Sequence, residues 1–370
     1  MKFFMVMVPL MSLLLVAETL HAAGLPPPEG KEFAPPEMNR PWLHEASGLR
    51  FPSELAELEC VEGFAFAGKN LGSMLRYVEK ELRIKADVYV YPCLLPLGTP
   101  EEMKEAAVEE ARQVLGGIKQ AEKAGVYTDV SEPEVSYEEL GLYPDEKKKT
   151  CLLTIPMQMT IHQGKGAGDV PNRVHSFTAL SVYEKHYVKI RCSFAADKDD
   201  EKRVEVVREF VNAVLFCVRE PGMRAEMKEH IRTYQADPLS AKARDVAGAV
   251  SVYADKTPLL VFGMPAEIVM LGESLEKEFP EAPQDLLRAY MVGAVAEALQ
   301  EPLPKELDLE QAAAVQVVKV YELMKKQKPG LESELVEDFA KAVHAGRGPD
   351  WFEALRKEMD QNAKGAQKER

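Results

Sequence analysis

Two predicted β-strands carry side chains that could bind a ligand. Lys189 and Arg191 alternate with apolar residues in one strand, and Tyr89 and Tyr91 do the same in another. Because neighbours in a strand point to opposite faces, these four side chains are expected on the polar face of one sheet. The same phase is assigned to Lys85, Gln158 and His162. Aromatic residues and arginine are frequent in binding hot spots, so we expect an exposed platform for an acidic ligand or partner. Two alternatives are that the helical domain packs over this face and that these are ordinary sheet-surface residues.

Residues suited to catalysis or metal binding are present without the spacing that such sites need. Six histidines follow residue 23, and none forms an H-E-x-x-H pattern. A single S-x-x-K match, from Ser274 to Lys277, lacks the partner motifs of serine–lysine enzymes. The segments 63–70 and 162–169 contain glycines and a lysine but do not clearly open a helix, as a phosphate-binding loop must. The sequence therefore predicts no metal, no cofactor and no catalytic residue.

The five cysteines predict buried thiols. An odd number leaves at least one cysteine unpaired, and no C-x-x-C spacing indicates a redox or zinc motif. Cys192 in a strand and Cys217 in the following helix are expected roughly 20 Å apart, beyond disulfide reach. Small buried thiols behave as hydrophobic residues.

The first 23 residues are typical of a secretory signal peptide. Lys2 precedes an apolar run of about 14 residues, and small residues end it at Ala22 and Ala23. This run is shorter than the roughly 20 residues that span a bilayer, so we expect no transmembrane segment after cleavage. The expected location is the periplasm or the extracellular space.

Charge argues against nucleic-acid binding. The chain has a net charge of −14, and no stripe of lysine or arginine compensates for it. Such a protein repels phosphate backbones.

The N-terminal half predicts an α+β domain. Prolines over 24–47 favour an extended linker. Between 48 and 220, aromatic and β-branched segments predict strands, the clearest at 149–162 and 187–195. Thr99-Pro100-Glu101-Glu102 predicts the start of a helix through about residue 121. A second helix follows the last strand. We expect a largely antiparallel sheet with both helices on one face.

This element order, with the phrase "HYVKIRCSF" before a terminal helix, resembles uncharacterised exported bacterial proteins and the PsbP-like α/β/α sandwich. The resemblance covers residues 48–220 and implies no functional residue.

The C-terminal half predicts an all-α domain over 221–360. Pro221-Gly222 is expected to end the preceding helix. Helical spacing of apolar residues then predicts a succession of further helices. Residues 361–370 are a polar tail.

Two classes of function are consistent with these features. The first is a non-catalytic, exported cell-envelope protein that binds a protein or a small ligand. The alternative is an exported hydrolase with a site at the domain junction, where pockets often form.

Overall fold

The computed structural model describes residues 29–38, 40–67, 71–95, 97–141, 149–161, 172–196, 200–263, 265–301 and 308–368. The predicted signal peptide, the segment 162–169 and His162 lie outside these ranges. The chain divides into two compact units, residues 1–222 and residues 223–370.

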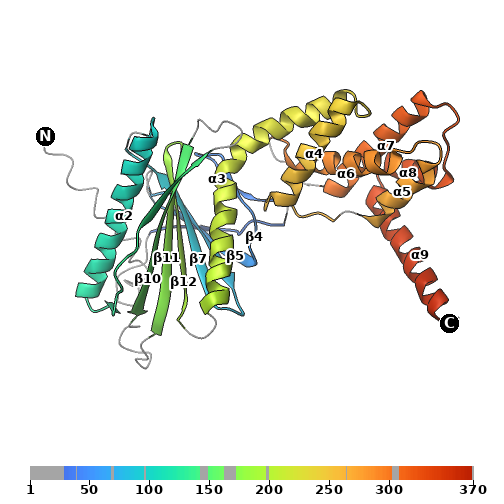
Figure 1. The fold of residues 1–370 in the computed structure, drawn as a ribbon. Coiled ribbons are helices and arrows are strands. Elements are labelled where there is room, and N and C mark those ends of the chain that lie inside the picture. Colours follow the sequence, from blue (N-terminus) through green and yellow to red (C-terminus); the bar gives the residue numbers. More distant parts are fainter. Residues whose placement is uncertain are drawn as a thin grey trace. The chain divides into compact units, whose positions relative to one another are not determined.

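Antiparallel strands dominate the first unit (Figure 1). They are β1 (Gly30–Phe33), β2 (Trp42–His44), β3 (Leu49–Phe51), β4 (Glu54–Leu55), β5 (Leu58–Phe66), β6 (Ser73–Glu79), β7 (Ile84–Pro92), β8 (Tyr127–Thr128), β9 (Ser136–Gly141), β10 (Lys149–Ile161), β11 (Asn172–Tyr183) and β12 (His186–Ala195). The main sheet has the order β1-β5-β6-β7-β12-β11-β10-β8, with β4 on β5 and β9 on β10, while β2 and β3 form a separate pair. The sheet and the helices after it confirm the predicted α+β class.

The helices are α2 (Pro100–Lys123), α3 (Asp200–Ala236), α4 (Ala241–Lys256), α5 (Ala266–Glu276), α6 (Ala282–Ala298), α7 (Leu309–Gln327), α8 (Glu334–His344) and α9 (Gly348–Lys368). The predicted start of α2 is confirmed. The Thr99 hydroxyl accepts a hydrogen bond from the backbone of Glu102, and the Glu102 carboxylate accepts one from the backbone of Thr99, forming a capping box.

The expectation that both helices cover one face of the sheet is wrong. On one face, Tyr187 of β12 donates a hydrogen bond to the carbonyl of Ala106 in α2. On the other face, the Phe210 ring of α3 packs 5.3 Å from that of Tyr77, which lies opposite Ala86 in the sheet. Both faces of the sheet carry apolar side chains, so each needs its own cover. Figure 1 shows α2 and the first part of α3 on either side of the sheet.

Three boundaries also differ from the prediction. From residue 29 onward, the expected linker contributes β1, which pairs with β5, and β2, whose Trp42 stacks on Phe33 at 5.1 Å. Helix α3 does not end at Pro221. Proline removes one helical hydrogen bond, at a cost of about 3 kcal/mol, and the long helix on both sides retains the others. The tail at 361–370 continues α9 as far as Lys368.

The cores of the two units are built separately. In the first unit, Cys151, Leu153 and Ile155 of β10 are buried in a cluster that includes Val114 of α2. In the second unit, Asp285 of α6 is buried and receives hydrogen bonds from Arg244 and Arg288. The buried carboxylate therefore has its charge compensated by two guanidinium groups.

Candidate functional site

The four predicted platform residues lie together, but α2 covers them. Lys189 and Tyr91 are 4% and 2% exposed, and Tyr89 and Arg191 are half-buried. The prediction that these residues form an exposed platform is therefore wrong. Glu110 of α2 lies over Lys189 and Tyr91. The alternative drawn from the sequence was that the C-terminal helical domain would cover these residues.

Glu110 provides the buried counter-charge for this cluster. Its Oε1 lies 3.3 Å from Lys189 Nζ and accepts a hydrogen bond of 2.5 Å from the Tyr91 hydroxyl. The ammonium also lies 4.9 Å from the centre of the Tyr91 ring and 5.4 Å from that of Tyr89. Burial lowers the pKa of Lys189 and raises that of Tyr91, and Glu110 opposes the first shift and adds to the second. The cluster holds α2 to the sheet.

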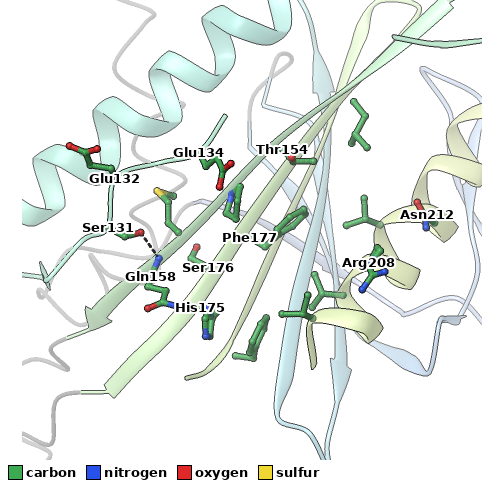
Figure 2. Close-up of a pocket in the computed structure, with 17 residues that line it drawn as sticks. Ser131, Glu132, Glu134, Thr154, Gln158, His175, Ser176, Phe177, Arg208 and Asn212 are labelled. Atoms are coloured by element: carbon green, nitrogen blue, oxygen red, sulfur yellow. Dashed lines mark hydrogen bonds between the residues drawn. The ribbon is translucent and has the colours of Figure 1, made fainter. Parts of the chain in front are cut away.

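A groove on the opposite face of the sheet is the better candidate for a site. It has a volume of about 570 Å³ and lies between the segment 131–134, strands β10 and β11, and the first turns of α3. Figure 2 shows Ser131, Glu132 and Glu134 on one side, Arg208 and Asn212 on the other, and Phe177 between them.

The floor of the groove is apolar because the sheet turns a second hydrophobic face toward α3. Pro156 of β10 lies directly opposite Phe177 of β11, and both are partly accessible. Val204, Val207 and Val211 recur at helical spacing on the adjoining side of α3. Val204 is 45% exposed. An accessible apolar surface with charged residues along its edges is typical of a binding site.

Polar groups fix the edges of the groove. The Ser131 hydroxyl accepts a 2.9 Å hydrogen bond from the backbone N–H of Gln158, which ties the segment 131–134 to β10. The Gln158 side chain accepts a hydrogen bond from Arg173 at 3.0 Å. Gln158 lies opposite His175, which lies opposite Phe194. Gln158 therefore belongs to the face away from Lys189, contrary to the phase assigned from the sequence.

His175 is the titratable group in the floor of the groove. Its Nε2 lies 2.8 Å from Asp200 Oδ2, and its ring stacks on Phe194 with centroids 5.0 Å apart. No hydroxyl or thiol among the described residues hydrogen-bonds His175. Ser176 is adjacent in sequence, but alternation in the strand sends its side chain to the other face. The arrangement orients a histidine and provides no activated nucleophile.

None of the five cysteines lines the groove. The prediction of buried thiols is confirmed, since all five cysteines are buried and free. Burial raises the pKa of Cys60 and Cys151 to about 12, so these thiols stay protonated at neutral pH. Within the described ranges, no group of three or more histidine, cysteine, aspartate or glutamate residues is placed to hold a metal ion.

The sequence reasoning missed the groove, although a signal was present. Leu152 and Pro156 of β10 interrupt the phase that was taken as polar, and Phe177 of β11 adds a large aromatic side chain beside them. Large apolar residues on that phase indicate a second buried or ligand-covered face.

Known proteins offer a structural likeness to this chain and no relative by sequence. No protein-family model and no curated protein matches this chain. Among solved structures, the chain is similar to the solution structure of cyanobacterial PsbP (CyanoP) from Synechocystis sp. PCC 6803. The two are 12% identical, with a TM-score of 0.29, over 50% of this chain and 90% of that chain. The weak PsbP-like resemblance expected from the element order is thus found.

No helix in the described part of the chain is both long enough and apolar enough to cross a bilayer.

Proposed function

We propose that this chain is an exported, non-catalytic binding protein of the cell envelope, and that the groove beside α3 holds a small, largely apolar ligand. The observation that carries this proposal is the accessible apolar floor around Phe177 and Val204. The volume of about 570 Å³ lies within the usual range of small-molecule sites, about 300–1,000 Å³.

The charged edges set the orientation of the ligand. Arg208 on one side and Glu132 and Glu134 on the other leave room for a polar end, while the floor takes the apolar body. Binding of this kind needs no reacting group, which agrees with the pairing of His175 to Asp200. Export is supported by the pattern of the first 23 residues. An intact mass of the exported protein that begins at residue 23 or 24 would support it, and a mass that includes Met1 would refute it.

A neutral fluorescent probe tests the groove directly. N-phenyl-1-naphthylamine, which brightens in apolar surroundings, is titrated into the wild type and into Val204→Glu. The matched control is Val108→Glu, because Val108 is also a helical valine of the first unit, is 36% exposed, and lies outside the groove.

We expect Val204→Glu to weaken probe binding about tenfold, since a charge is placed on the apolar floor. Val108→Glu should bind like the wild type. Equal binding by all three proteins would contradict the proposed site.

A further inference from the structure

A second cavity lies within the helical unit. It has a volume of about 480 Å³ and is bounded by one face each of α3, α6 and α7. On α3 the lining residues are Lys228, Ile231, Arg232 and Gln235, and on α7 they are Ala312, Val315, Gln316 and Lys319. Both sets follow the i, i+3, i+4, i+7 spacing of a single helix face, so each helix turns one continuous stripe toward the cavity.

The walls of this cavity are held in place by close packing and by ion pairs. A Cβ atom on Gly293 of α6 would lie 2.7 Å from Ala313 Cα and 2.8 Å from Gln316 Cβ, so glycine allows α7 to approach here. Glu301, just after α6, forms ion pairs with Arg224 at 3.0 Å and with Lys228 at 2.8 Å. The positive charges of Lys228 and Arg224 lower the pKa of Glu301 to about 2.

Gln316 places a polar side chain on the wall of the cavity. The residue is 4% exposed, and no described residue hydrogen-bonds its side-chain amide, so the amide is open to a ligand in the cavity. An amide can both donate and accept, so it matches a peptide group, which does the same.

Lys319 supplies a cation one turn further along the same face. It is exposed and forms no ion pair with a described residue. Lys228 and Arg232, by contrast, are paired with Glu301 and Glu229. Three lining side chains are basic and one, Glu297, is acidic. Because Lys228 and Arg232 already have carboxylate partners, Lys319 is the cation among the described lining residues that is left to pair with an anionic group.

We propose that this cavity binds the carboxyl end of a short peptide: Lys319 pairs with the terminal carboxylate, Gln316 hydrogen-bonds the preceding peptide group, and the floor of Ala296, Ala312 and Val315 contacts small side chains. This cavity shares no lining residue with the groove beside the first turns of α3, and the proposal does not depend on that groove.

The test uses two peptides that differ only in the C-terminal group, a charged carboxylate in one and a neutral amide in the other. Acetyl-Ala-Ala, with a free carboxylate, and acetyl-Ala-Ala-amide are each titrated into the full-length protein, followed by calorimetry and by the side-chain amide signals in a ¹⁵N–¹H spectrum. The variants are Gln316→Leu and Lys319→Gln. The control is Lys326→Gln, because Lys326 is an exposed lysine of α7 that does not line the cavity.

We expect the free-acid peptide to bind with a Kd in the millimolar range and to shift the amide signals that Gln316→Leu removes. Each cavity variant should weaken binding about tenfold, and Lys326→Gln should not. No binding of the free acid, equal binding of the two peptides, or unchanged binding by Lys319→Gln would each overturn the proposal. Lys319 is exposed, so that variant keeps the test valid even if Gln316→Leu folds poorly.

Discussion

Removing Glu110 should destabilise the first unit strongly, because it leaves the ammonium of Lys189 buried without a counter-charge. Both side chains are 5% exposed, and the Tyr91 hydroxyl loses its acceptor in the same step. Breaking a buried pair costs about 3–5 kcal/mol. The rings of Tyr89 and Tyr91 still contact the Lys189 ammonium after the substitution, so we expect a cost at the lower end of this range. We therefore expect Glu110→Ala to lower the free energy of unfolding by about 3 kcal/mol.

Urea unfolding followed by the emission of Trp42 measures this loss in the first unit. The chain has two tryptophans, so the experiment is done in a Trp351→Phe background. Glu109→Ala is the matched control, because Glu109 precedes Glu110 on α2 but is exposed and pairs with Arg112. It should cost less than about 0.5 kcal/mol.

The effect should also depend on pH and on the partner. Without Glu110, the pKa of Lys189 in the folded state falls further below its unfolded value, so the variant should regain stability as pH rises toward about 10. Replacing both residues by apolar ones, as in Glu110→Leu with Lys189→Met, should recover most of the loss. A cost for Glu110→Ala equal to that of Glu109→Ala would refute the reasoning.

Two further predictions concern other parts of the molecule. Burial and the nearby His186 lower the pKa of His44 to about 4, so the folded state stays neutral where the unfolded state is protonated. Stability should therefore fall as pH decreases from about 6.5 to 4, and His44→Gln should flatten this dependence in urea titrations at several pH values. An unchanged slope would contradict the argument. Gly293→Ala should destabilise the second unit by about 1–3 kcal/mol through its clash with α7, whereas Gly116→Ala, with open space around it, should be neutral or stabilising. Thermal unfolding of both variants measures the difference, and equal melting temperatures would refute the argument.

The elements that the sequence predicted well are those whose signals are local. The start of α2 is encoded in the four residues from Thr99 to Glu102, and the alternation in β10 follows from neighbouring side chains. The predicted faces of β12 are also correct, since Ile190 lies opposite buried Val88 and away from Lys189. Such patterns need no knowledge of distant contacts.

The errors arise where a distant partner decides the structure. Whether Lys189 is exposed depends on Glu110, which lies 79 positions earlier and belongs to another element. Alternation separates two faces of a strand but does not show which of them is covered, so both helices were placed on one side. In the same way, Gly30–Phe33 becomes a strand because β5 offers a pairing edge, which no local composition signals.

The central claim is that the groove beside α3 holds a small apolar molecule, and the most direct test is to look for that molecule. The wild type, Val204→Glu and Val108→Glu would be isolated as exported proteins under native conditions, and the compounds released on denaturation identified by mass spectrometry. We predict that the wild type and Val108→Glu each release the same apolar compound in an amount proportional to the protein, and that Val204→Glu releases much less of it. The same compound in equal amounts in all three proteins, or none in the wild type, would contradict the account.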